Sequence, residues 1–210
     1  MRVASSLEGL TAESEPWFAA LRADEEGDLV GAVVLYLKDA AGSVEEGAFA
    51  RAGLCCSCAA DCLVKLGYAG EARSLYHEAA TVYRDVFESA IGTSLREALW
   101  SLERAYECFL LSGEAAEARL IRDMYKPLAR RVDPFIQENL LQPPRRSPPA
   151  STHPTTGSQG GQGDAELQRA IRSFLSSQPS RPRPKPAAES DRSTAGSSLI
   201  DEEYIIKQLG

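Results

Sequence analysis

The sequence predicts an all-α fold for its first two-thirds. Ala, Leu, Glu and Arg, which favour helices, dominate residues 1–141. Only three prolines interrupt this part, at Pro16, Pro127 and Pro134. No run of alternating β-branched residues indicates a strand. Hydrophobic residues make up 43% of the 210-residue chain, which is enough for a packed core.

Apolar periodicity and turn residues divide this part into helices. The expected ranges are 14–23, 27–41, 46–66, 69–88, 92–112 and 114–131, with 133–141 as a further short helix. Pro16 suits the first turn of a helix. Gly42 and Gly67 are expected just after helix ends, because glycine readily adopts the left-handed conformation found there.

The composition changes near Gln142. Residues 142–210 hold nine of the twelve prolines but only two of the fifteen aromatic residues, so most of this part buries too little to order itself. We expect five segments: a helical-repeat domain (1–141), a flexible linker (142–163), an amphipathic recognition helix (164–178), a second flexible linker (179–197) and a C-terminal apolar binding segment (198–210).

Two stretches of the helical part repeat at an offset of 46 residues. Cys62 matches Cys108, Gly67 matches Gly113, and the sequence Glu-Ala-Arg at 71–73 recurs at 117–119. Each copy therefore contains a helix, a glycine turn and a second helix. One such pair cannot bury its apolar face alone, so the pairs are expected to stack.

The pattern A-x-x-C-L-x-x-L-G-x-x-x-E-A-x-x-L-Y-x-x-A-A over 59–80 resembles a tetratricopeptide repeat (TPR). The long helices and the L-Y-x-x-A-A sequence from Leu75 to Ala80 are more similar to the soluble NSF attachment protein branch. The resemblance covers about 27–131. It implies a short TPR-like solenoid of antiparallel helix pairs that binds other proteins and carries no catalytic residues.

Charge and hydropathy exclude several classes of protein. Residues 1–141 carry 14 basic and 23 acidic side chains, a formal charge of −9, which opposes direct binding to nucleic acid. No stretch of eighteen apolar residues predicts a transmembrane helix. The N-terminal residues lack the apolar core of a signal peptide, and five cysteines without such a signal favour a reducing, cytoplasmic setting.

The cysteines raise the question of a metal site. Cys55, Cys56, Cys58 and Cys62 share one predicted helix, and Cys108 lies one repeat later. Helical residues seven apart are separated by about 10.5 Å along the axis, whereas zinc holds each sulfur at about 2.3 Å. We therefore expect small, buried, apolar-like cysteines and no metal or cofactor. A Cys-dependent metal or redox protein is the least favoured alternative.

The chain shows no arrangement of residues typical of an enzyme. His77 and Glu78 lack the second histidine of a zinc-protease helix, and no P-loop, nucleophile elbow or dinucleotide fingerprint occurs. The acidic run from Asp24 to Asp28 is expected to complement the positive end of the following helix. We predict a protein without catalytic activity.

The segment 164–178 has one apolar face, formed by Leu167, Ala170, Ile171, Phe174 and Leu175. Gln168, Ile171, Phe174 and Leu175 resemble the motif by which replication and repair proteins bind the ring-shaped sliding clamp (PCNA). That resemblance implies an apolar plug and a glutamine in a separate polar pocket. The alternative is an amphipathic helix laid into the groove of another protein. Because proline-rich linkers flank the segment, we expect Phe174 not to support the core.

The segment 199–210 is rich in apolar residues and follows a polar linker, so it is expected to bind somewhere. Both a helix and an added strand fit its pattern, and both a partner and the chain's own groove could receive it, with a partner favoured. The candidate contact residues are Leu199, Ile200, Tyr204, Ile205 and Leu209.

These observations favour a protein-interaction adaptor: a helical-repeat platform plus tethered short binding motifs. The alternative function is a sliding-clamp-binding accessory factor of DNA replication or repair. Tethering would raise the effective concentration of the second motif to the millimolar range once the first is bound.

Overall fold

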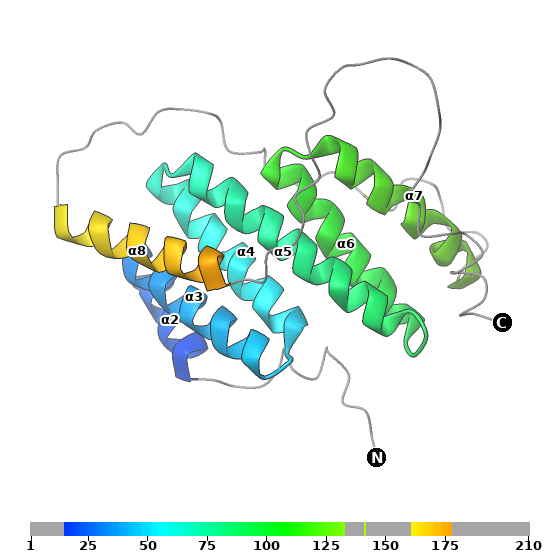
Figure 1. Cartoon of the computed structure of the whole chain (residues 1–210), viewed down its shortest axis with the longest axis horizontal. Helices are drawn as coiled ribbons and strands as arrows, with labels where there is room; N and C mark the ends of the chain where they lie inside the picture. The colour runs from blue at the N-terminus through cyan, green and yellow to red at the C-terminus, as the bar shows by residue number, and fades with distance from the viewer. Residues whose placement is uncertain (1–14, 133–140, 142–160, 178–210) are drawn as a thin grey trace.

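The computed structural model describes residues 15–132, 141 and 161–177. All regular secondary structure in these residues is helical, which confirms the all-α class (Figure 1). The helices are α2 (Glu15–Glu26), α3 (Leu29–Glu45), α4 (Phe49–Leu66), α5 (Ala69–Ala90), α6 (Leu95–Ser112), α7 (Ala115–Val132) and α8 (Gly161–Ser177). Apart from Leu141, the expected short helix over 133–141 lies outside the described residues, as does the segment 199–210.

The helices from α2 to α7 follow one another through the molecule. Each packs against the next in the sequence, so that α2 lies on one side and α7 on the other (Figure 1). Helix α8 departs from this order, since it packs against α3 after a long connection from α7. Residues far apart in the sequence thus meet at α3.

Three of the helix–helix turns close in the same way. Gly47, Gly67 and Gly113 have φ values of +75°, +86° and +90°. After the last two, the amide of Tyr68 donates to the carbonyl of Leu63 at 2.9 Å, and Glu114 donates to Phe109 at 2.8 Å. These bonds satisfy carbonyls at the helix ends that would otherwise lack partners.

The expected role of Gly67 is therefore confirmed, whereas that of Gly42 is wrong. Gly42 lies inside α3, which continues to Glu45, and the left-handed turn residue is Gly47. The acidic run does end at a helix start as expected. The Asp28 side chain caps α3 by accepting a hydrogen bond from the Gly31 amide at 3.0 Å.

Helices α4 and α5 approach closely at a glycine. A Cβ atom placed on Gly53 would lie 2.9 Å from Cζ of Tyr83, whose ring is buried and packs edge-to-face on Trp100 at 5.5 Å. Gly70, near the start of α5, has nothing within 4 Å of the same position. The two glycines therefore differ in packing although both are helical.

We expect Gly53→Ala to lower the free energy of unfolding by about 1–3 kcal/mol, because the new methyl overpacks the Tyr83 ring. Gly70→Ala is the matched control. It adds the same methyl to open space, so it should leave stability unchanged or raise it by up to about 1 kcal/mol. Urea denaturation of the two full-length variants checks this, and equal effects would rule out close contact at Gly53.

Candidate functional site

Helix α8 docks on its own domain through the apolar face seen in the sequence. Leu167, Ile171 and Phe174 are 0%, 2% and 5% exposed, and all three belong to the core cluster that also holds the buried residues of α3. Ala170 and Leu175 are partly buried against the same cluster. The domain thus binds this helix through side chains at positions i, i+4 and i+7.

Helix α3 requires a further neighbouring helix such as α8 because it is apolar on more than one side. Its sequence from Leu29 to Leu37 is interrupted only by Gly31 among apolar residues. Val33, Tyr36 and Leu37 are all buried, and a helix that is hydrophobic around most of its circumference requires several neighbours. Helices α2, α4 and α8 provide them.

Two polar contacts fix the N-terminal half of α8 against the start of α5. The hydroxyl of Tyr68 donates to Oδ1 of Asp164 at 2.7 Å, and Nε2 of Gln168 donates to Oε1 of Glu71 at 3.0 Å. The Asp164 carboxylate, by accepting this bond, raises the pKa of Tyr68 above its ordinary value. The two contacts define the register in which α8 lies.

The expectation that Phe174 does not support the core is wrong. A proline-rich linker limits what its own residues can bury, but it does not prevent the helix beyond it from docking. Gln168, Ile171, Phe174 and Leu175 all contact the chain's own domain. Their binding to a partner stays a prediction.

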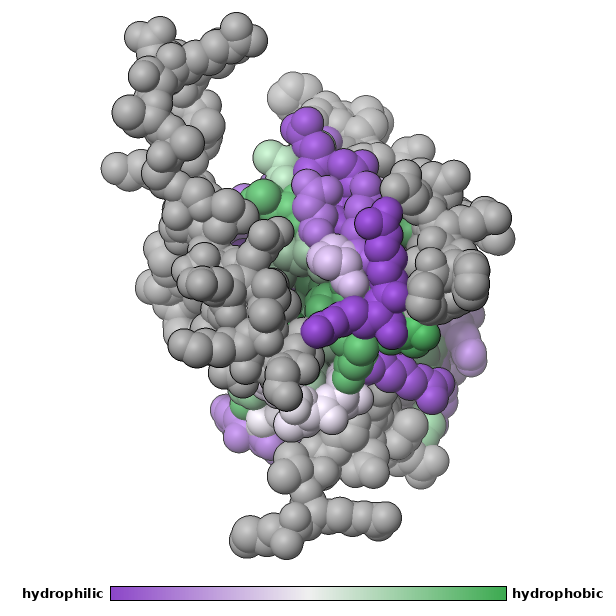
Figure 2. Space-filling view, turned by 90° about the vertical axis from the view of Figure 1, so that its right-hand side faces the viewer, coloured by the Kyte–Doolittle hydropathy of each residue, from purple (hydrophilic) through white to green (hydrophobic). Residues whose placement is uncertain are grey.

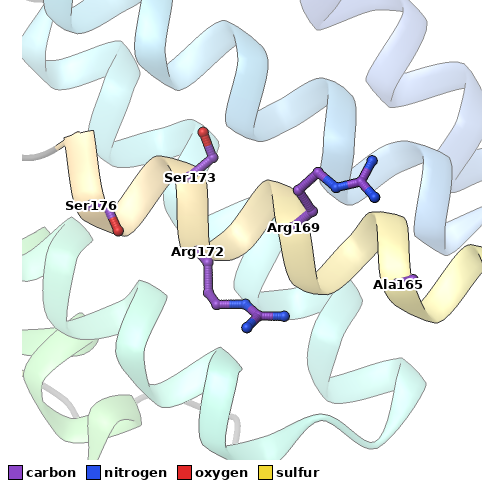
Figure 3. A pocket seen from close by; sticks show the side chains of 5 residues that line it. All are labelled: Ala165, Arg169, Arg172, Ser173 and Ser176. Atoms are coloured by element: carbon purple, nitrogen blue, oxygen red, sulfur yellow. The ribbon is translucent and has the colours of Figure 1, made fainter.

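The outward face of α8 is polar. Ala165, Arg169, Arg172, Ser173 and Ser176 line a surface hollow of about 470 Å³ along this face. Figure 3 shows the two arginine side chains extending from the helix in different directions. These five residues are exposed and lie outside the core cluster that holds Leu167, Ile171 and Phe174.

The cysteines lie in the helix interfaces. Cys55, Cys56, Cys62 and Cys108 are buried, and Cys58 is half-buried. Burial raises the pKa of the Cys62 and Cys108 thiols to about 12, which keeps both neutral near pH 7. The expected burial is thus confirmed for these four cysteines, although Cys55 and Cys108 also make polar contacts, with Asp39 at 3.1 Å and Ser57 at 3.5 Å. Within the described residues, no group of three or more His, Cys, Asp or Glu side chains could hold a metal ion.

A buried ion pair that the sequence does not reveal joins α3 to α4. Nε of Arg51 donates to Oδ2 of Asp39 at 2.9 Å, and a second guanidinium nitrogen donates to Oδ1 at 3.0 Å. The side chains are 5% and 6% exposed, and the Cys55 thiol also donates to Asp39 at 3.1 Å. The pair fixes α4 relative to the helix on which α8 docks.

Other polar side chains near surface hollows are paired with one another. A hollow of about 390 Å³ lies among α2, α4, α5 and α6. There, Lys65 pairs with Asp24 at 2.6 Å, and the Tyr76 hydroxyl donates to Asp61 at 2.5 Å. His77, on α5, lies 2.6 Å from Glu114 at the start of α7. These contacts join α2 to α4, α4 to α5, and α5 to the start of α7.

In the part of the chain that the structure describes, no helix is both long and apolar enough to cross a membrane. Comparison of the chain with protein-family models, with curated proteins and with solved structures found no match.

Proposed function

We propose that this chain is a non-enzymatic adaptor that binds other proteins through a short TPR-like solenoid and tail segments. The observation that carries the proposal is the seating of α8. This amphipathic helix, separated from the platform by residues 133–160, lies on α3 and bonds to the start of α5. A surface that accepts one tethered amphipathic helix has the chemistry to accept another.

The helix pairs support the solenoid part of the proposal. The pairs α4–α5 and α6–α7 turn at Gly67 and Gly113, which occupy equivalent positions in the 46-residue repeat. The two turns make the same backbone hydrogen bonds. Helices α5 and α6 also pack against each other, so that one pair stacks on the next.

The groove under α8 defines the partner by its chemistry. It takes three apolar side chains at the spacing of Leu167, Ile171 and Phe174. The Tyr68 hydroxyl donates a hydrogen bond to a carboxylate at the position of Asp164, and the Glu71 carboxylate accepts one from a donor at the position of Gln168. A partner helix with this pattern would use the helix-in-groove mode and compete with α8.

The sliding-clamp alternative depends on release of α8. Gln168, Ile171 and Phe174, which the clamp motif would present, all face the domain. An isolated 161–178 peptide that binds a sliding clamp more strongly than the full-length chain does would favour this alternative. If neither the peptide nor the full-length chain binds the clamp, the clamp alternative is excluded and the groove under α8 stays the proposed site of recognition.

Selection of helical peptides against the full-length Ile171→Asp chain tests the proposal. This variant places a charge in the apolar interface and should free the groove. Selected peptides should carry apolar residues at i, i+4 and i+7 and an acidic residue three positions before the first. The 161–178 peptide should compete with them. The proposed function would be contradicted if the selected peptides lacked this pattern. It would also be contradicted if they bound the wild-type chain as strongly as the Ile171→Asp chain.

A further inference from the structure

Helix α7 carries positive charge in an acidic domain. It holds five basic side chains against two acidic ones, a formal charge of +3, whereas residues 1–141 together carry −9. Arg119, Arg130 and Arg131 are exposed. On the side where α7 lies in Figure 1, the described surface is largely hydrophilic, with hydrophobic areas between the hydrophilic strips (Figure 2).

The same helix also exposes apolar side chains. Its buried face, which includes Ile121, Tyr125 and Leu128, packs towards α6. Leu120 is nevertheless 50% exposed and Val132 is 58% exposed, and Pro127 is exposed as well. Since residues 120 and 127 are seven apart, Leu120 and Pro127 lie on one outward stripe. Arg131 continues this stripe, and Arg119 and Arg130 lie along one side of it. We call this stripe and its basic neighbours the α7 face.

We propose that the chain's own segment 199–210 docks on the α7 face. The segment begins with two apolar residues, continues with Asp201, Glu202 and Glu203, and then contains the apolar run from Tyr204 to Ile206. With Lys207 it carries three acidic side chains and one basic, a formal charge of −2. It thus supplies apolar and acidic groups where α7 supplies apolar and basic ones.

The composition of the α7 face favours a peptide over a nucleic acid. A phosphate backbone would pair with the arginines but would gain nothing from Leu120 and Pro127. An acidic segment with apolar residues uses both kinds of group.

The connection permits this docking. The 21 residues of 178–198 separate α8 from the segment. Fully extended, a chain of this length spans roughly 70 Å, whereas a domain of this size is about 40 Å across. The inference concerns a different face from the α8 groove and does not depend on binding at that groove. It assigns 199–210 to the chain's own domain instead of to a partner, so of the tail segments in the proposed function it leaves only α8 for partners.

Hydrogen exchange of the full-length protein, followed by mass spectrometry, tests the docking. Amides of 199–210 should exchange at least tenfold more slowly in the chain than in a synthetic peptide of the same sequence. The variant R119E/R130E/R131E should bring exchange to the rate of the free peptide. Combining it with D201K/E202K/E203K should restore the protection, because both sets of charges are then reversed.

The matched control is R169E/R172E, which reverses two exposed arginines on α8. It should leave protection of the segment unchanged. Exchange of α5 amides in each variant verifies that the domain is folded, since all substituted α7 residues are exposed. Free-peptide rates in the wild-type chain, or protection that survives reversal of α7, would overturn the proposal. So would an α7 reversal that abolishes binding of a short DNA duplex while leaving exchange of the segment unchanged.

Discussion

Phe174→Ala is expected to lower the free energy of unfolding of the full-length chain by about 3–5 kcal/mol, the usual cost of truncating a buried phenylalanine. Phe174 is 5% exposed and lies in the core cluster with Leu167 and Ile171. Its loss leaves a cavity between α8 and α3, and it also removes apolar area that holds α8 in place. Thermal and urea denaturation measure the change.

Phe18→Ala is the control for this prediction. Phe18 lies on α2 and is 42% exposed, so truncating it removes the same atoms from a surface that water already reaches. We expect a loss below about 1 kcal/mol, as is usual for exposed positions. If the two variants lose the same stability, or if neither does, α8 does not pack on α3 in solution.

Asp39→Ala is expected to cost about 3–5 kcal/mol, because it leaves the buried Arg51 guanidinium without the carboxylate that neutralises it. Both side chains are almost fully removed from water, and two hydrogen bonds of 2.9 and 3.0 Å join them. Replacing both partners, as Asp39→Leu with Arg51→Met, should recover much of the loss, because no charge then stays buried.

The exposed pair between Lys65 and Asp24 provides the comparison. Its nitrogen–oxygen distance is shorter, at 2.6 Å, but the Lys65 side chain is about half exposed. Water and salt screen such a pair, so Lys65→Ala should cost less than about 1 kcal/mol. A larger loss for Lys65→Ala than for Asp39→Ala, measured by urea denaturation, would contradict the buried environment of the α3–α4 pair.

The sequence predicts local structure where local chemistry determines it. The helices follow from composition and periodicity, and the turns at Gly67 and Gly113 follow from glycine's access to positive φ. The end of α3 does not follow from the sequence in this way. Gly42 lies inside the helix, and the residue with positive φ in the next turn is Gly47. A glycine alone therefore does not mark the end of a helix. The residues after it can remain helical, as Ser43 to Glu45 do in α3.

Long-range contacts escape this kind of reasoning. The apolar face of α8 is evident from Leu167, Ile171 and Phe174, but periodicity does not specify the surface that covers it. The apolar run of α3 from Leu29 to Leu37 shows that this helix needs several neighbours, but it does not identify α8 as one of them. The Asp39–Arg51 ion pair could not be predicted from the sequence. Acidic and basic residues form both buried and exposed ion pairs, and the sequence alone does not tell the two kinds apart.

Binding of a labelled 161–178 peptide to the full-length Ile171→Asp chain tests the central claim most directly, namely that the groove under α8 recognises an amphipathic helix. Fluorescence anisotropy should show saturable binding. The wild-type chain should bind at least tenfold more weakly, because its own α8 is tethered at an effective concentration of about millimolar. The full-length Phe174→Ala chain, whose substitution buries no charge, serves as a second receptor. The 161–178 peptide carrying the same substitution is the negative control. Equal binding to the wild-type and variant chains, or binding to none of them, would contradict the account.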